Sequence, residues 1–377
     1  MSLLIVNYEY PPIGAGAANA SFYLAQALTR RRQEVVVLTS GYGNLRGYTR
    51  EGGVHIYRLR TRRSLPDRSN LGEMGLFLAA ALCAAPGLAR RHRLGKAIVF
   101  FTLPCGPVGY ALKHSRQIPY VISLRGGDVP GLVPELDSIH RLITPLRRLV
   151  LREARHLVAN APGLAALSYQ ADPFPVNVIP NGVEADFFRP GPQFAAGNPV
   201  FPFLFVGRFQ PQKNLFFLLA RFRELQDASH RPFHLHLVGD GPLKGDLQQY
   251  AVRLGLQDRI TWHGWLDKGT LRVVYQSCGC FINPSLYEGL PNTVLEAMAS
   301  GLPVVASRIP GNYDLVKPGE TGYLISISNP EEFTLALQDV LDHPEQAESL
   351  GKAGRELVLR DFSWDRVALE YLNLFPG

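Results

Sequence analysis

The amino-acid sequence predicts an α/β protein with two domains, each built on a parallel sheet that helices cover on both faces. Short, strongly apolar runs typical of buried strands alternate with longer helical patterns along the chain. The chain has 377 residues, enough for two domains of ordinary size. A segment rich in proline and glycine at residues 186–200 interrupts the series, which we interpret as a linker.

The first predicted domain covers residues 1–185. Its first strand, residues 3–6, leads into a glycine-containing loop and then into a helical pattern at residues 18–31. Further strands are predicted at residues 34–38, 97–101, 120–123, 156–159 and 177–179. Residues 71–89 are apolar, but Glu73, Pro86 and many alanines make them a poor membrane span, so we expect a packed or interfacial helix there.

The second predicted domain covers residues 201–360. Its strands are predicted at residues 203–206, 234–238, 259–262, 281–282 and 304–305. A last helical pattern, within residues 361–377, begins after Ser363, which is a suitable helix cap.

The charge of the chain is unevenly distributed. The formal net charge is +7, but residues 1–185 hold 22 Lys and Arg against 11 Asp and Glu, whereas residues 186–377 hold 17 against 21. This asymmetry indicates an anionic partner for the first half, such as an anionic bilayer or a phosphorylated acceptor, unless the arginines form an ordinary solvated face. Nucleic acid is not expected, because no recognisable nucleic-acid module accompanies the charge.

The four cysteines do not form a disulfide or zinc framework. Because no Cys/His set has zinc spacing, we expect all four to be small core residues and no metal to be bound. Their scarcity fits a reducing cytoplasm, and the first residues lack the basic and apolar regions of a signal peptide.

The most informative segment is residues 285–306, which carries two carboxylates, Glu288 and Glu296, around a predicted helix start. Asn292 is the expected N-cap, and Gly301 followed by Pro303 should end the helix. Free amides at a helix start suit a phosphate, and carboxylates accept hydrogen bonds from sugar hydroxyls. The segment therefore suggests a nucleotide sugar, although both acids could simply complement the helix dipole.

Several motifs occur in the order typical of one enzyme family. The string of residues 288–305, with its two glutamates eight positions apart, resembles the donor-site signature of the retaining glycosyltransferases of family 4. The other matching motifs are residues 11–16, 179–183, 206–209 with 213–214, and 238–242. The resemblance implies the GT-B fold, with two Rossmann-like, doubly wound domains facing a cleft and a last helix that crosses back onto the first domain.

The resemblance also implies roles for residues of the second half. Glu288 would contact the donor sugar, and Glu296 would hold the ribose. Arg208 and Lys213 would bind the diphosphate and stabilise the leaving nucleotide. No Asp-x-Asp motif occurs, so a metal-independent reaction without a cofactor is expected. The remaining donor-binding positions implied by the family pattern are Gly289, Leu290, Thr293, Gly239 and Asp240, of which the last two could instead form a simple turn.

In the first half, the glycine loop and one departure from the family pattern matter. Gly14 and Gly16 follow the first strand, where the resemblance places a loop near the donor phosphates, although a tight turn would look the same. Many relatives carry a histidine where this chain has Arg125, whereas Asp128 keeps its place. We expect Arg125 to contact either the carboxylate of a uronic-acid donor or the phosphate of an acceptor. Alternatively, Arg125 would form a salt bridge with Asp128.

The sequence thus predicts a retaining glycosyltransferase. Its donor would be a nucleoside-diphosphate sugar, with UDP favoured and GDP-mannose as the other candidate, and its acceptor a glycan, a lipid-linked or a phosphorylated compound. Localisation is expected in the cytoplasm, with peripheral contact to an anionic membrane. Two alternatives stay open: a nucleotide-sugar epimerase of the same fold, and a non-catalytic nucleotide-sugar-binding protein at a membrane.

Overall fold

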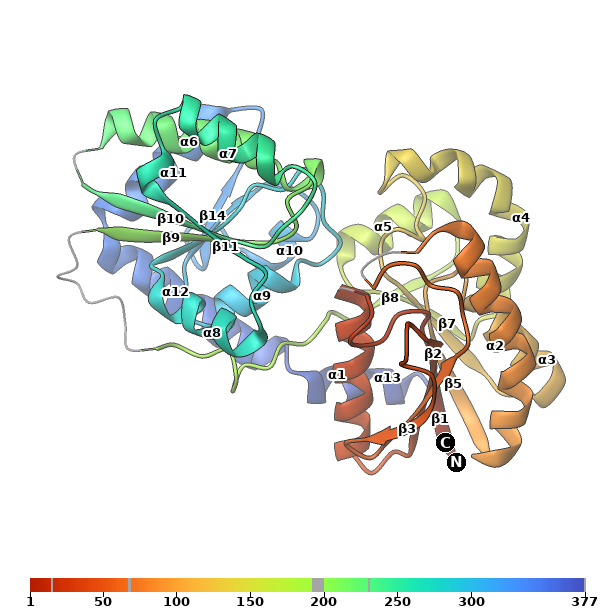
Figure 1. Ribbon diagram of the computed structural model, residues 1–377. Helices are drawn as coiled ribbons and strands as arrows, with labels where there is room; N and C mark the ends of the chain where they lie inside the picture. The colour runs from red at the N-terminus through yellow and green to blue at the C-terminus, as the bar shows by residue number, and fades with distance from the viewer. Residues whose placement is uncertain (15, 67–68, 192–199, 230, 376–377) are drawn as a thin grey trace. The chain divides into compact units, whose positions relative to one another are not determined.

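The computed structural model describes residues 1–14, 16–66, 69–191, 200–229 and 231–375 (Figure 1). The chain forms two compact units: unit 1 comprises Met1–Gly182 and Trp364–Gly377, and unit 2 comprises Val183–Ser363. The boundary between the units thus falls after Gly182, three residues before the predicted end of the first domain at residue 185. The predicted linker at residues 186–200 belongs to unit 2, and its residues 192–199 lie outside the described part. The last helix belongs to unit 1.

Unit 1 is built on an eight-stranded sheet of order β3-β4-β2-β1-β5-β6-β7-β8, in which β3 is antiparallel to β4 and the other pairs are parallel. Its strands are β1 (Ser2–Val6), β2 (Val35–Ser40), β3 (Gly47–Glu51), β4 (Val54–Leu59), β5 (Leu94–Phe100), β6 (Tyr120–Leu124), β7 (His156–Ala159) and β8 (Val176–Val178). Its helices are α1 (Gly16–Arg30), α2 (Leu71–Arg91), α3 (Gly106–Arg116), η1 (Pro134–Leu136), α4 (Asp137–Glu153), α5 (Pro162–Ala171) and α13 (Trp364–Asn373).

Both faces of this sheet are buried. Leu3 and Ile5 of β1 pack into a core shared with α1 and α13. Because side chains alternate along a strand, Leu4 and Val6 face the other side, and they too are fully buried. α2 packs there against β2, β4 and β5 and against α3. This two-sided burial explains why the strands read as continuous apolar runs.

Helix α2 starts at a capping box. The side chain of Asn70 accepts from the Glu73 amide at 2.9 Å, and the Glu73 carboxylate accepts in return from the Asn70 amide at 3.2 Å. By length and composition this helix could cross a membrane. In the structure Phe77, Ala81 and Ala85 are buried on its inner side, so α2 is a packed helix that leaves an apolar outer face.

Unit 2 is built on a six-stranded parallel sheet of order β11-β10-β9-β12-β13-β14. Its strands are β9 (Phe201–Val206), β10 (Phe233–Val238), β11 (Ile260–Gly264), β12 (Cys280–Asn283), β13 (Val304–Ser307) and β14 (Gly322–Ile325). Its helices are η2 (Pro211–Lys213), α6 (Leu215–Ala228), α7 (Lys244–Arg253), η3 (Gln257–Arg259), α8 (Lys268–Ser277), α9 (Asn292–Ala299), α10 (Asn312–Leu315), α11 (Pro330–Asp342) and α12 (Pro344–Asp361).

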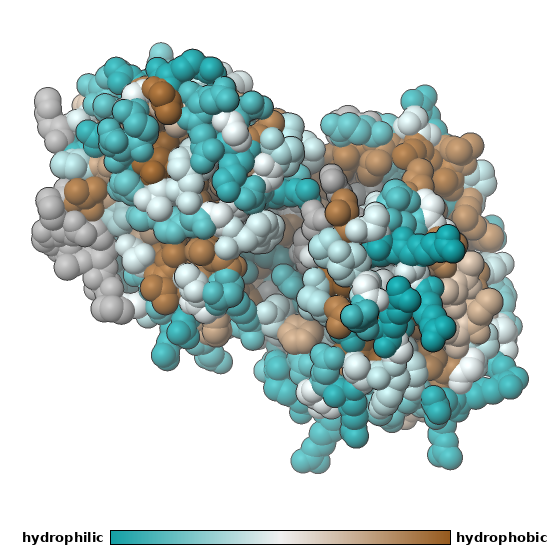
Figure 2. Space-filling model, in the orientation of Figure 1, coloured by the Kyte–Doolittle hydropathy of each residue, from teal (hydrophilic) through white to brown (hydrophobic). Residues whose placement is uncertain are grey.

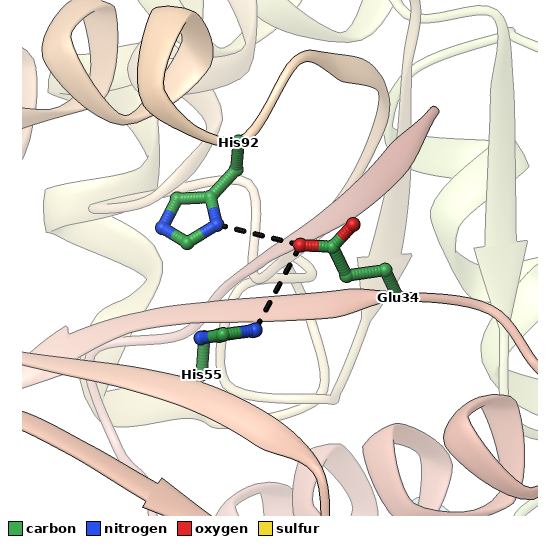
Figure 3. A group of neighbouring side chains, drawn as sticks. All are labelled: Glu34, His55 and His92. Atoms are coloured by element: carbon green, nitrogen blue, oxygen red, sulfur yellow. Dashed lines mark ion pairs between the residues drawn. The ribbon is translucent and has the colours of Figure 1, made fainter.

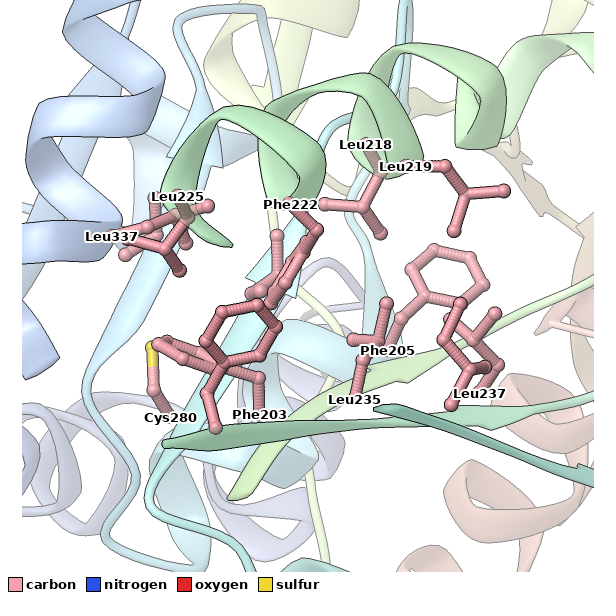
Figure 4. Close-up of a cluster of buried hydrophobic side chains, with 14 of the residues drawn as sticks. Phe203, Phe205, Leu218, Leu219, Phe222, Leu225, Leu235, Leu237, Cys280 and Leu337 are labelled. Atoms are coloured by element: carbon pink, nitrogen blue, oxygen red, sulfur yellow. The ribbon is translucent and has the colours of Figure 1, made fainter. Parts of the chain in front are cut away.

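Aromatic side chains fill one face of the unit 2 sheet. Phe203 and Phe205 of β9 point toward α6, where they meet Leu218, Leu219 and Phe222 (Figure 4). The ring centroids of Phe203 and Phe222 lie 5.2 Å apart in a T-shaped arrangement. Edge-to-face packing of this kind adds about 0.5–1.5 kcal/mol to the stabilisation from burial.

Each sheet has a topological switch point. In unit 1 the chain winds outward from β1 through β2 and then from β5 through β8 on the other side, so the strand order reverses between β1 and β5. In unit 2 it reverses between β9 and β12. Ligands of open α/β sheets bind at the carboxyl ends of the strands that flank such a point. The loops after β1, β5, β9 and β12 are therefore the places to look for a site.

Three sequence-based expectations need correction. The N-cap position of α9 is occupied by Pro291, and Asn292 is already helical, so the predicted cap was wrong by one residue. Cys105, Cys278 and Cys280 are buried, but Cys83 is exposed on the outer face of α2. Strands β3, β4 and β14 were missed, and every residue of β3 is exposed, which leaves no apolar pattern to find.

Candidate functional site

Lys213 and Glu288 meet at the switch point of unit 2. Lys213 ends the 3-10 turn that follows β9, and Glu288 lies in the loop that follows β12. Their side chains form an ion pair between Nζ and Oε1, with only 16% and 9% of the side-chain surfaces exposed. Glu288 Oε1 also lies 2.7 Å from the hydroxyl of Ser285. A largely buried charge pair is thus held where the topology predicts a ligand.

A buried network of hydrogen bonds holds the loop that carries Glu288. The Ser285 hydroxyl also lies 2.6 Å from the side-chain oxygen of Asn283, whose amide group donates to Asn312 at 3.1 Å. Ser307, at the end of β13, donates to the Ser285 carbonyl at 2.5 Å. Because buried polar groups cost free energy unless they are satisfied, this network fixes the loop that carries Glu288.

Glu296 lies one helical turn into α9 and is bound to Tyr275 of α8. The tyrosine hydroxyl donates to Glu296 Oε2 at 3.0 Å. Burial raises the pKa of Glu296 to about 7, and the hydrogen bond from Tyr275 partly opposes this rise. The carboxyl group therefore changes its charge near neutral pH.

The glycines after β10 bring two loops into close contact. A Cβ on Gly239, which has a φ of +130°, would overlap the carbonyl of Gly207, and one on Gly241 would overlap that of Phe209. The Phe209 amide donates to the Asp240 carbonyl at 2.9 Å. Only glycine permits this approach, which holds the loop that carries Arg208.

Asp240 itself is engaged within unit 2. Its Oδ2 accepts from Lys244 Nζ at 2.8 Å, and Oδ1 accepts from the Gly241 amide at 2.7 Å. The hydrogen bond from Lys244 lowers the pKa of Asp240. The Asp240 side chain is thus bonded to Lys244, the first residue of α7, and any contact with a sugar donor would have to share these hydrogen bonds.

The loop before α9 is shaped by a second close approach. Gly311 has a φ of +88°, and a Cβ there would overlap the carbonyl of Gly289. Leu290, the next residue, has a buried side chain. The Tyr275 hydroxyl, whose proton is donated to Glu296, also lies 3.3 Å from the Thr293 carbonyl, so one tyrosine contacts both Thr293 and Glu296.

The glycine loop of unit 1 is packed against its own unit. Gly14 has a φ of +91°, and a Cβ there would lie 2.6 Å from that of Glu9. Its amide donates to the Pro66 carbonyl at 2.7 Å and so already has a partner. Gly16 is the first residue of α1. The loop is a tight turn at the unit 1 switch point, which agrees with the structural alternative and leaves a ligand role untested.

Asp128 organises the loops after β5 and β6. Its buried carboxylate accepts from the amides of Thr102, Arg125 and Gly126 at 2.8, 2.9 and 3.1 Å. The Thr102 hydroxyl lies 3.3 Å from the same carboxylate. With this many donors the group is a loop-forming carboxylate rather than a free base.

The Arg125 guanidinium does not pair with Asp128, so the predicted salt bridge is wrong. It donates instead to the Asn181 side chain at 2.6 Å and to the Tyr371 hydroxyl at 3.4 Å, and it lies 4.3 Å from the centre of the Phe100 ring. Burial lowers the pKa of Arg125. The side chain thereby links the carboxyl end of the sheet to α13.

A second charged cluster lies elsewhere in unit 1. Glu34 Oε1 is 3.7 Å from His55 Nε2 and 3.5 Å from His92 Nδ1 (Figure 3). The other ring nitrogens bond to the hydroxyls of Tyr48 and Tyr57 at 2.9 and 2.8 Å. Two histidines and a carboxylate could in principle hold a metal ion. Because the three residues precede or begin β2, β4 and β5, they lie at the amino ends of the strands, away from the switch point.

Two family models match the chain. One, glycosyl transferases group 1, matches residues 192–357, and the other, a glycosyl transferase 4-like domain, matches residues 15–182. The chain belongs to the group 1 glycosyltransferases. It is therefore a glycosyltransferase of the GT-B fold, as the order of its motifs predicted.

Individual glycosyltransferases and a solved structure are similar to the chain. An uncharacterised glycosyltransferase of Methanocaldococcus jannaschii is 26% identical over 100% of this chain and 98% of its own. The UDP-Gal:alpha-D-GlcNAc-diphosphoundecaprenol alpha-1,3-galactosyltransferase of Escherichia coli is 33% identical over 45% of this chain and 46% of its own. Among solved structures, sucrose-phosphate synthase of Thermosynechococcus elongatus matches with a TM-score of 0.85 at 23% identity, covering 99% and 98% of the two chains.

Sequence reasoning missed the residues that support the candidate site of this glycosyltransferase. Tyr275, Asn283, Ser285 and Asn312 were not singled out, although Ser285 opens the most informative segment. Their contacts span up to 29 positions of sequence. A pattern of charges along the chain does not report such pairs, because they form only when loops and helices that are distant in the sequence pack together.

Proposed function

We propose that the protein catalyses metal-independent, retaining transfer of a sugar from a UDP-sugar to a hydroxyl group of a glycan, lipid-linked or phosphorylated acceptor. The observation that carries this proposal is the contact between Lys213 and Glu288 at the switch point between β9 and β12. A cation suited to a phosphate and a carboxylate suited to sugar hydroxyls adjoin there, as they would where the sugar meets the diphosphate.

In the proposed reaction, Lys213 and Arg208 stabilise the negative charge that develops on the leaving diphosphate. Preorganised donors of this kind are typically worth about 3–4 kcal/mol of transition-state stabilisation each. Glu288, held by Lys213 and Ser285, accepts from a hydroxyl of the donor sugar and orients it. The donor phosphate takes the proton of the acceptor hydroxyl, a role for which neither Asp128 nor Glu288 is available because both are already engaged.

The nucleotide is assigned to UDP, with GDP-mannose as the second choice. The name of the E. coli relative states a UDP-sugar donor and an alpha linkage, and because ordinary UDP-hexoses are α anomers, an α product corresponds to retention. In this proposal Glu296 holds the ribose, while the amides of Gly289 and Leu290 and the helix start at Thr293 face the phosphates. We assign Arg125 a structural role, because its guanidinium is already held by Asn181 and Tyr371.

The reaction is proposed to occur in the cytoplasm at the surface of an anionic membrane. The excess of arginine in the first half of the chain supports this location. Each basic residue near an anionic bilayer contributes about 1 kcal/mol.

Product analysis tests the proposal. Purified protein is incubated with UDP-glucose, UDP-galactose or GDP-mannose and a panel of acceptors, with and without EDTA. A glycosylated product with an α linkage, formed equally in EDTA, supports it. An epimerised donor would establish the epimerase alternative, and loss of activity in EDTA that a divalent ion restores would overturn the metal-independent mechanism.

Variants connect the activity to the site. Arg208→Ala and Glu288→Ala should each reduce turnover about 100-fold or more. Arg223→Ala is the matched control, since Arg223 pairs with Asp227 on the exposed side of α6. Near-normal turnover in both site variants would refute the assignment.

A further inference from the structure

A groove in unit 1 runs between α2 and α4. It has a volume of about 340 Å³ and is lined by Leu71, Met74, Gly75 and Leu78 from α2 and by Ile139 and Ile143 from α4. Its lining also includes Tyr8, Thr102 and Asp128, which follow the carboxyl ends of β1, β5 and β6, and β1 and β5 flank the unit 1 switch point. The groove therefore leads from the place where a substrate is expected to the surface of the unit.

The surface around the groove is apolar and basic. Leu71, Leu142 and Leu146 are 63%, 83% and 43% exposed, and hydrophobic side chains gather over α4 in the space-filling view (Figure 2). Arg148 and Arg152 extend from the same helix, each paired with a carboxylate but with 54% and 65% of their side chains exposed. Exposed leucines beside arginines are typical of a surface that meets an anionic bilayer.

One buried polar side chain in the groove is only weakly partnered. His140 is 6% exposed, and among the described residues its ring nitrogens make no hydrogen bond of good geometry, the Gly127 backbone being a weak partner. Its neighbour Arg147 is occupied by Asp172, at 2.6 Å. A buried imidazole with an unfilled hydrogen bond costs free energy, so the ring favours a ligand that supplies a polar group to its second nitrogen.

We propose that this groove holds the hydrocarbon chain of a lipid-linked acceptor, with a polar group of the acceptor bonded to His140. The inference rests on the proposed function and narrows its acceptor to one class. A free glycan would need several polar partners along the groove, and the lining offers few that are not already engaged. A hydrocarbon chain needs none, and each methylene that it buries should strengthen binding about fourfold.

The chain-length test uses the full-length protein with farnesyl phosphate, geranyl phosphate and inorganic phosphate, and binding is measured by calorimetry below the micellar concentration. Farnesyl phosphate should bind at least about tenfold more tightly than geranyl phosphate, and inorganic phosphate should bind weakest. Equal affinities for the two prenyl phosphates would overturn the proposal.

Two glycines of α2 provide a matched pair of variants. Gly75 lines the groove, Gly87 does not, both are exposed, and a Cβ on either meets open space. Gly75→Leu should fill the groove and weaken farnesyl phosphate binding at least about tenfold, whereas Gly87→Leu should not change it. Both substitutions favour the helix, so unfolding does not confuse the comparison. An equal effect, or no effect, of the two substitutions would contradict the proposal.

Further measurements distinguish a lipid from a second copy of the chain in the groove, and separate failure of this proposal from failure of the proposed function. If Gly75→Leu turned a dimer into a monomer, the groove would be covered by a second copy and the proposal would fall. His140→Phe should weaken farnesyl phosphate more than farnesol, and an equal effect on both would remove the histidine from the proposal. Binding of UDP-glucose, measured on the same samples, should be unchanged in both glycine variants. If the wild type bound no nucleotide sugar, the proposed function would fail while the groove test stayed readable.

Discussion

The raised pKa of Glu296 should make donor binding dependent on pH. If the ribose hydroxyls donate to this carboxylate, the ionised form binds the donor and the neutral form binds it less well. With a pKa of about 7, the ionised fraction rises from about one tenth at pH 6 to about nine tenths at pH 8. The affinity for a UDP-sugar should therefore increase by up to about tenfold over this range, equivalent to about 1.4 kcal/mol.

The direction of the effect identifies its source. The diphosphate of a UDP-sugar is fully ionised throughout this range, so the ligand does not titrate. Histidines lose their positive charge as the pH rises, which would weaken the binding of an anion. A rise in affinity with pH thus requires an acid that ionises near neutrality, and burial gives Glu296 that property.

The assay is calorimetric titration of UDP-glucose at several pH values, with two variants. Glu296→Gln should bind with little pH dependence and at about the weaker affinity of the wild type at low pH. Tyr275→Phe removes the hydrogen bond that holds the pKa of Glu296 down, so the midpoint of the transition should move above pH 7. A flat profile in the wild type, or an unchanged slope in Glu296→Gln, would refute the reasoning.

Three further predictions concern unit 2. Gly311→Ala should lower the free energy of unfolding by about 2 kcal/mol or more because it adds a clash to backbone strain, whereas Gly319→Ala, at a φ of +75° in open space, should lower it by only about 1 kcal/mol. Chemical denaturation measures both values, and equal losses would exclude the clash. Burial lowers the pKa of His236 to about 4, so its neutral form contributes fully to the free energy of unfolding above about pH 6.5, and about 3 kcal/mol of that contribution should be lost as the pH drops to about 4. His236→Phe should flatten this slope in acid unfolding curves, and an unchanged slope would assign the pH dependence to another group. Lys213→Met should destabilise the fold by about 3 kcal/mol, because it removes the cation paired with Glu288. The double variant Lys213→Met, Glu288→Gln should regain stability but not turnover, and restored turnover would remove the pair from the proposed mechanism.

Apolar runs and short motifs in the sequence were enough to predict much of the fold and the location of the candidate site. Strands such as β2 and β9 could be predicted because both faces of each sheet are buried, which makes the strands uninterrupted apolar runs. The ordered motifs identified the family, and the segment around Glu288 and Glu296 marked the donor loop. Strand β3 could not be predicted, since all its residues are exposed and its pairing with β4 depends on the neighbouring strand.

The sequence by itself determined the α/β class, the family and which residue types face the candidate donor site, because these depend on composition and spacing along the chain. Only the tertiary structure decided how those residues are engaged. In the structure Lys213 pairs with Glu288, Arg125 binds Asn181 rather than Asp128, and His140 is buried in an apolar groove with only a weak partner among the described residues. Such contacts join side chains from loops far apart in the sequence, and the packing of helices on the sheets sets their distances and burial.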